Sequence, residues 1–215
     1  MHIKVLTTGY LGSHIYLIEE SGRIILIDIG DADIVRKELI NTNYIIDYGI
    51  LTHEHCDHIY GCSAIRDEYH CAIISSRLCN ENIKDSRTNS SKYFESFIGV
   101  HSNLTPDYQK WMPPFTTYAD RVFDDELTID WMEHRLYMRE TPGHSQGSIC
   151  IIVDDSYLFS GDTLMKDVVT ETRFKGGSAA AYHQYTLPWL MSLSPNMIVY
   201  PGHGDVFRLG EKLKK

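Results

Sequence analysis

The chain has 215 residues, of which 43% are hydrophobic, and its 20 Lys and Arg against 29 Asp and Glu give a formal net charge of −9. This acidic balance disfavours general nucleic-acid binding, because phosphate contacts need a basic surface. No apolar run approaches the roughly 18 to 20 residues that cross a bilayer, so we expect no membrane partner.

The length suits one domain, and we predict that residues 1–215 form it. The N-terminus begins with a strand pattern rather than a charged and then apolar leader. The five cysteines contain no Cys-x-x-Cys pair, which is typical of a reducing compartment. These features together predict a cytoplasmic protein.

The first half of the chain alternates strand-like and helix-like segments. Apolar runs predict strands at 2–7, 14–20, 24–27, 47–52 and 71–74, and helical spacing predicts helices at 33–41, 58–67 and 76–84. Asp31 or Asp33 can cap the first of these helices.

A different composition marks the stretch from about 85 to 119, which is polar at its start and rich in aromatic residues and proline at its end. We interpret it as an insertion that can serve as a lid over a site. We expect its Tyr108–Tyr118 part to narrow the entrance, with Trp111 in contact with substrate. A satellite hydrophobic cluster or the contact of a homodimer are the alternatives.

The second half repeats the strand-rich theme. Strands are predicted at 127–129, 135–138, 149–153, 157–160 and 197–200, with a helix at 178–193. Two strand-rich halves, each flanked by helices, favour an α+β fold, a four-layer αββα sandwich with its ligand loops at one edge.

The strongest chemical signal is the run Thr52-His53-Glu54-His55-Cys56-Asp57-His58, directly after a buried strand. A helix or strand would scatter its three imidazoles and the Asp57 carboxylate, so the run must form a turning loop. Neutral imidazole and carboxylate are ligands for Zn²⁺, and also for Fe or Mn. Neighbouring side chains point apart, which favours two adjacent ions. A polar surface loop is the alternative.

Further ligands for two ions are available downstream. The runs Thr141-Pro142-Gly143-His144, Ser160-Gly161-Asp162-Thr163 and Pro201-Gly202-His203-Gly204 each begin where an apolar strand-like run ends. Each has a glycine just before its ligand, which permits a tight turn and close backbone approach.

In these motifs and their order, the sequence resembles the metallo-β-lactamase superfamily of hydrolases, most closely its glyoxalase II-like small hydrolases. The resemblance implies that one metal binds His53, His55 and His144, that a second binds Asp57, His58 and His203, and that Asp162 bridges the two. It also implies that Asp28 fixes a histidine ring of the ligand loop. Diiron oxidoreductases of this fold tend to carry a carboxylate where this chain has His55, which favours the hydrolytic branch.

The resemblance further implies that the helix at 178–193 borders the metal pocket, which makes Tyr182 and His183 candidate substrate contacts. Arg173 and Lys175 lie just before that helix and can hold a substrate carboxylate or phosphate, or be ordinary surface charges. Hydroxyacylglutathione hydrolases carry a C-terminal helical glutathione-binding domain. Only residues 205–215 follow the last predicted ligand, so the resemblance does not carry glutathione specificity with it.

The expected cofactors are two divalent metal ions, zinc first, with iron or manganese as alternatives. The main hypothesis is hydrolysis of a small-molecule ester, thioester or lactone by a hydroxide that bridges the ions, with Asp57 binding metal and orienting the hydroxide. A phosphodiesterase of small molecules or cyclic nucleotides is the alternative enzyme. A metal-loaded binding or sensing module with little turnover is the alternative of another class.

Overall fold

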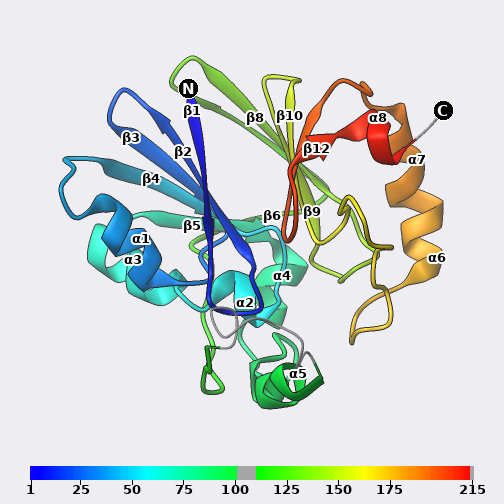
Figure 1. Cartoon of the computed structure of the whole chain (residues 1–215), viewed down its shortest axis with the longest axis horizontal. Helices are drawn as coiled ribbons and strands as arrows, with labels where there is room; N and C mark the ends of the chain where they lie inside the picture. Colours follow the sequence, from blue (N-terminus) through cyan, green and yellow to red (C-terminus); the bar gives the residue numbers. More distant parts are fainter. Residues whose placement is uncertain (101–109, 214–215) are drawn as a thin grey trace.

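A computed structural model describes residues 1–100 and 110–213, except for the side chains of residues 99 and 100 (Figure 1). Within these residues, two six-stranded sheets pack face to face, and helices cover their outer faces. The predicted αββα sandwich is therefore confirmed. No helix in the described ranges is long and apolar enough to cross a membrane.

The first sheet holds the N-terminal strands in chain order. These are β1 (His2–Thr7), β2 (His14–Glu20), β3 (Arg23–Ile27), β4 (Ile45–Ile50), β5 (Ala72–Ser76) and β6 (Arg121–Phe123). β1 to β3 are antiparallel, whereas β3 to β6 are parallel. The outer face packs against α1 (Ala32–Leu39), α3 (Cys62–Tyr69) and α4 (Arg77–Asn82).

The second sheet holds the C-terminal strands. These are β7 (Glu126–Trp131), β8 (His134–Glu140), β9 (Ile149–Val153), β10 (Tyr157–Gly161), β11 (Ile198–Pro201) and β12 (Phe207–Arg208). Only the β10–β11 pair is parallel among these neighbours. The outer face of the second sheet carries α6 (Ala179–Ala181), a π-helical turn at Tyr182–Thr186, α7 (Leu187–Ser192) and α8 (Leu209–Lys212).

Alternating side chains place β3 at the centre of two cores. Ile25 and Ile27 point between the sheets, while Ile24 and Leu26 pack under the outer helices. A strand that is covered on both faces reads as a continuous apolar run. This explains why the uninterrupted run Ile24–Ile27 is a strand although it does not alternate with polar residues.

One predicted helix is corrected by the structure. The expected helix at 58–67 is two helices, α2 (Cys56–Ile59) and α3, separated at Tyr60 and Gly61. Gly61 donates its amide to Ile29 O at 2.7 Å, and a Cβ there would lie 2.6 Å from Ala32 N. The chain therefore bends where its backbone packs against the start of α1.

The segment from 85 to 119 also has elements that the composition did not predict. It contains a 3-10 turn at Ser91–Tyr93 and α5 (Phe94–Val100), which protrudes near α2 at the edge of the sandwich opposite both termini (Figure 1). Residues 101–109 lie outside the described ranges, and this includes Tyr108.

A hydrogen bond joins the two sheets at the β4 and β7 strands. Trp131 Nε1, on a side chain that is 4% exposed, donates to Asp47 Oδ2 at 2.7 Å. Arg23 Nε donates to the same oxygen at 2.8 Å. Asp47 thus provides the acceptor for the indole N–H of a buried tryptophan.

We expect Asp47→Ala to lower the free energy of unfolding by about 1–3 kcal/mol, the usual cost of leaving a buried donor without its partner. Urea unfolding followed by tryptophan fluorescence measures it. The control is Asp130→Ala on the exposed face of β7, for which a change within about 0.5 kcal/mol is expected. Equal stability of the two variants would contradict the role of the Asp47–Trp131 contact.

Candidate metal centre

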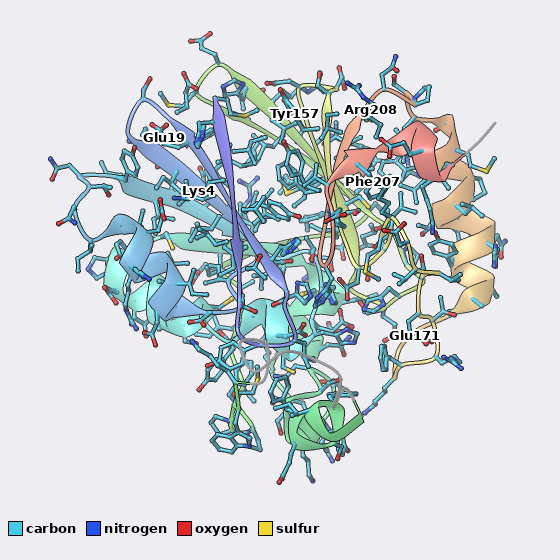
Figure 2. All side chains as sticks on the ribbon, in the orientation of Figure 1. Lys4, Glu19, Tyr157, Glu171, Phe207 and Arg208 are labelled. Carbon is cyan, nitrogen blue, oxygen red and sulfur yellow. The ribbon has the colours of Figure 1, made fainter. Side chains whose placement is uncertain are left out.

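The candidate ligands lie where strands end at one edge of the sandwich. His53 and His55 follow β4, and Asp57 and His58 begin α2. Tyr157, at the start of β10, lies at the upper edge in Figure 2, so this strand runs down towards α2 and delivers Asp162 immediately after Gly161. The two remaining ligands also lie at strand ends: His144 between β8 and β9, and His203 after β11. Asp28, the predicted partner of a ligand ring, comes after β3.

His53, His55 and His144 form the first cluster, in which one nitrogen of each ring lies within 4.8 Å of the others. His144 Nε2 is 2.9 Å from His55 Nδ1. All three side chains are buried. They come from two loops that are 89 residues apart in sequence, and the packing of the two sheets brings them together.

Asp57, His58 and His203 form the second cluster within the same limit. His58 Nε2 lies 3.2 Å from His203 Nε2, and Asp57 Oδ2 lies 3.3 Å from His203 Nε2. Both ring nitrogens and the carboxylate therefore converge on one small volume.

Asp162 lies between the clusters. Its Oδ2 is 3.6 Å from His144 Nε2 and 3.6 Å from His203 Nε2. Its Oδ1 is 3.6 Å from His58 Nε2. This is the position that a carboxylate shared by two ions would occupy.

Hydrogen bonds outside the clusters fix which ring nitrogen faces inward. Asp28 accepts from the Thr52 hydroxyl at 2.8 Å and contacts His58 Nδ1 at 2.8 Å. His53 Nδ1 lies 3.0 Å from the same Thr52 oxygen, and His144 Nδ1 lies 2.9 Å from Glu171 O. A carboxylate and a carbonyl only accept, and the Thr52 proton is already given to Asp28. The Nδ1 atoms of His53, His58 and His144 therefore carry protons, so Nε2 is the nitrogen of these rings that faces the clusters and can bind a metal ion.

The backbone of Asp28 is part of this arrangement. Asp28 has φ +58°, in the left-handed region that only a few residue types visit readily. In this conformation its carboxylate turns back onto the next strand, where Oδ1 also accepts from Thr52 N at 2.7 Å. The turn at the end of β3 thus brings one carboxylate to Thr52, next to the ligand His53, and to the ligand His58.

These residues fit divalent metal ions. In the described part of the chain, the buried atoms His53 Nε2 and Asp162 Oδ1 have no hydrogen-bond partner. A buried polar atom without a partner costs free energy. Gly202 leaves room at the same point, because a Cβ there would overlap Asp162 Oδ1 and lie 2.9 Å from His58 Cε1. Imidazole and carboxylate donors of this kind match Zn²⁺ and related ions.

The two clusters differ in protonation. Burial and the neighbouring His144 lower the pKa of His55 to about 3, and burial lowers that of His53 well below its usual value. Burial also lowers the pKa of His58, but Asp57, Asp162 and Asp28 outweigh it and raise that pKa to about 10. Metal ions would therefore displace protons from the second cluster.

The sequence matches the family model described as "Metallo-beta-lactamase superfamily" over residues 8–203. The chain belongs to this superfamily. This membership, together with the hydroxyacylglutathione hydrolases among its relatives, indicates a metal-dependent hydrolase, and its His and Asp clusters imply divalent metal ions.

Relatives support the glyoxalase II-like branch of the superfamily. The chain is 27% identical over 205 residues to "Hydroxyacylglutathione hydrolase" of Shewanella loihica, which covers 94% of this chain and 66% of that protein. It is 24% identical over 203 residues to the protein of the same name from Aeromonas hydrophila, with 94% and 65% covered. The hydrolase thus spans just under two thirds of the length of these two relatives.

Solved structures support the same fold. The crystal structure of "BLEG-1 B3 metallo-beta-lactamase" has a TM-score of 0.82 at 23% identity and covers 98% of this chain and 95% of that one. "TTHA1623 in a di-iron-bound form" has a TM-score of 0.73 at 23% identity, with 97% and 96% covered.

A cavity of about 530 Å³ opens onto the clusters of this superfamily hydrolase. Its lining includes five of the predicted ligands, namely His55, Asp57, His144, Asp162 and His203. His53 and His58 lie behind them, fully or almost fully buried. The structure therefore brings all seven predicted ligands together around one cavity.

The five predicted substrate contacts lie outside this lining. Arg173 pairs with Glu171 at 2.5 Å, with its side chain 88% exposed, and Lys175 and His183 are exposed. Tyr182 is buried against Gly143, the residue before the ligand His144; a Cβ added to Gly143 would lie 2.7 Å from the Tyr182 Cβ. Trp111 is 61% exposed. Their contact with substrate therefore stays a prediction.

The first part of the 85–119 segment reaches the cavity. The cavity is lined by Ser90 and Phe97 from the first part of the 85–119 segment, rather than by Trp111. Phe115 packs instead against Tyr60, with ring centroids 5.0 Å apart. In the described part of the segment, Met112 and Phe115 belong to a hydrophobic cluster with Phe94 and Phe97, and the lid stays a prediction.

Sequence reasoning missed two buried polar residues beside the ligands. Glu54 accepts from Asn82 Nδ2 at 2.8 Å and from Ser145 Oγ at 2.7 Å, which ties the His53 loop to the His144 loop. His14 donates its backbone amide to Gly202 O at 2.8 Å. Glu54 occupies a spacer position of the motif, and the sequence carries no signal that its side chain turns inward.

We expect Asp28→Asn to weaken zinc binding by about 10- to 100-fold, the usual effect of removing a partner that orients a ligand. The amide presents an N–H as well as an oxygen, so it no longer holds His58 Nδ1 protonated. Competition with a chromophoric chelator measures the affinity. Asp33→Asn, on the exposed surface of α1, is the control. Unchanged affinity in Asp28→Asn would show that the Asp28–His58 contact does not orient the ring.

Proposed function

We propose that the chain is a dinuclear hydrolase of a small-molecule ester, thioester or lactone. The observation that carries this proposal is the placement of Asp162 within 3.6 Å of ring nitrogens from both clusters. One ion would be held by His53, His55 and His144, and the other by Asp57, His58 and His203, with Asp162 shared. Each ion would then have three ligands of its own and would share Asp162 with the other.

When bound, two such ions lower the pKa of water and withdraw electrons from a substrate oxygen. The chain's own residues orient the reactants. Burial raises the pKa of Asp57, but His58 and His203 outweigh it and hold that carboxyl ionised. Asp57 lines the cavity, so its carboxylate can accept a hydrogen bond from the attacking water and later hold its proton.

A covalent route has little support in this site. Cys56 lines the cavity, but burial raises the pKa of its thiol well above the usual value, so the thiolate is scarce. Ser145 Oγ is engaged by Glu54 and by Ser148 Oγ at 2.8 Å. Direct attack by water is therefore the favoured mechanism.

Zinc is the ion that we propose first. The described ligands are mainly imidazoles, including His55 at the position where a carboxylate would favour iron. Iron and manganese remain alternatives, and the di-iron form of a related fold supports testing them.

The proposal is tested by assaying p-nitrophenyl esters, acyl thioesters and lactones, with bis-p-nitrophenyl phosphate as the phosphodiester probe. We expect ester, thioester or lactone turnover that is lost after treatment with a chelator and restored by Zn²⁺, Mn²⁺ or Fe²⁺. Turnover of the phosphodiester alone would favour the phosphodiesterase alternative. Metal binding without turnover of any substrate would favour a binding or sensing module.

We expect Asp57→Asn to reduce kcat/KM for the best ester by about a hundredfold or more, the range seen when a positioned acid–base group is removed. The matched control is Asp167→Asn, an exposed carboxylate on the loop after β10, which should leave turnover within about twofold. Circular dichroism should show that both variants are folded. Near-normal turnover in Asp57→Asn would contradict the assigned role.

A further inference from the structure

The cavity wall beyond the ligands is apolar. Besides the metal-site residues, the lining contains only two polar side chains, Ser90 and Glu171, among the described residues. The rest of the wall is hydrocarbon, aromatic or sulfur-bearing: Leu11, Cys56, Phe97, Met165, Val168 and Phe174. Metal-dependent hydrolysis does not itself require an apolar wall. We therefore interpret the wall as a binding surface for part of the substrate.

The apolar wall begins at the ligands themselves. The Phe174 ring meets His55 edge-on with centroids 5.6 Å apart, and it meets His144 at 6.0 Å. Phe97 contacts the other side of Phe174 at 5.9 Å. A substrate whose carbonyl lies between the clusters would therefore place its substituent against these two rings.

Part of this wall is exposed to water. Val168 is 49% exposed and Phe174 is 38% exposed, both on the loop that follows β10. Apolar side chains that converge on a concave site without filling it are typical of a ligand pocket. Burying them under a bound hydrocarbon group would remove that surface from water.

The charges around the cavity disfavour an anionic substituent. No Lys or Arg lines it in the described ranges, and the sequence of residues 101–109 contains neither type. Glu171 contributes to the wall from the loop ahead of α6, at the lower right of Figure 2, and its carboxylate is paired with Arg173. Its partner Arg173 points outward and is engaged by Glu171. Away from the metal site, the described part of the wall therefore offers no cation to pair with a carboxylate or phosphate of the substrate.

We propose that the cavity selects substrates with a neutral, apolar acyl group of several carbons, held against Phe97, Val168 and Phe174. This inference rests on the proposed hydrolase function and narrows its substrate class. Water adds to the acyl carbon, the bond from that carbon to the leaving oxygen or sulfur breaks, and the water proton passes to the leaving group. No other reactant is needed.

The first test is a series of p-nitrophenyl esters from acetate to hexanoate, together with the mono-p-nitrophenyl ester of glutaric acid, which carries a terminal carboxylate. We expect kcat/KM to rise about two- to fourfold per added methylene, as burial of a CH₂ predicts. The glutarate ester should be at least about tenfold slower than the neutral pentanoate ester, which has the same number of acyl carbons. A flat series, or faster hydrolysis of the glutarate ester, would overturn the inference.

A pair of neighbouring variants locates the effect. Val168→Lys puts a cation into the wall, whereas Val169→Lys puts the same charge on an adjacent residue that is 88% exposed and outside the lining. We expect Val168→Lys to lower kcat/KM for the hexanoate ester about tenfold and to raise it for the glutarate ester. Val169→Lys should change neither by more than about twofold. Equal effects of the two variants would contradict the assigned wall.

Binding of a neutral apolar dye, N-phenyl-1-naphthylamine, gives a readout that does not depend on turnover. The metal-loaded protein should enhance its fluorescence, Val168→Lys should weaken its binding about fivefold or more, and Val169→Lys should not. If no ester, thioester or lactone is hydrolysed but the dye binds as described, the proposed function fails while the apolar pocket stands. If esters are hydrolysed but Val168→Lys leaves the affinity for the dye unchanged, the apolar-pocket inference alone fails.

Discussion

The metal centre depends on one constraint: ring nitrogens and carboxylate oxygens, which are all potential hydrogen-bond acceptors, face one another at a buried edge of the sandwich. His144 Nε2 lies 2.9 Å from His55 Nδ1, and His58 Nε2 lies 3.2 Å from His203 Nε2. Outer hydrogen bonds place a proton on the far nitrogen of His58 and His144, so a metal ion and a further proton compete for the lone pair of each inward nitrogen. A proton or a metal ion between these atoms removes the conflict, and the imidazole and carboxylate donors match divalent metal ions.

The sandwich supplies the rigidity that this crowding requires. β3, β4, β10 and β11 end together at the edge, and their cores on both faces hold the strand ends in place. Asp28, with its left-handed backbone, and Gly202, whose backbone packs against Asp162 and His58, then restrict the conformations of the ligand side chains. Beside this polar edge, Phe174 and Phe97 form an apolar wall, so one cavity combines reactive groups with a hydrocarbon surface.

Much of this arrangement could be predicted from the sequence, because the signals are local. The His53–His58 run concentrates ligands where a strand ends, and continuous apolar runs such as Ile24–Ile27 mark strands covered on both sides. Other features depend on contacts between distant segments. The sequence does not reveal that Glu171 engages the Arg173 side chain, or that Phe97 rather than Trp111 reaches the cavity. The two-residue strand β12 is likewise too short to leave a pattern.

The most direct test of this account is the metal content of the protein after loading with excess Zn²⁺, Mn²⁺ or Fe²⁺ and removal of unbound metal. Elemental analysis against protein concentration should saturate at about two ions per chain, because each cluster offers three ligands and Asp162 serves both. Saturation at one ion per chain under excess metal would contradict the dinuclear centre.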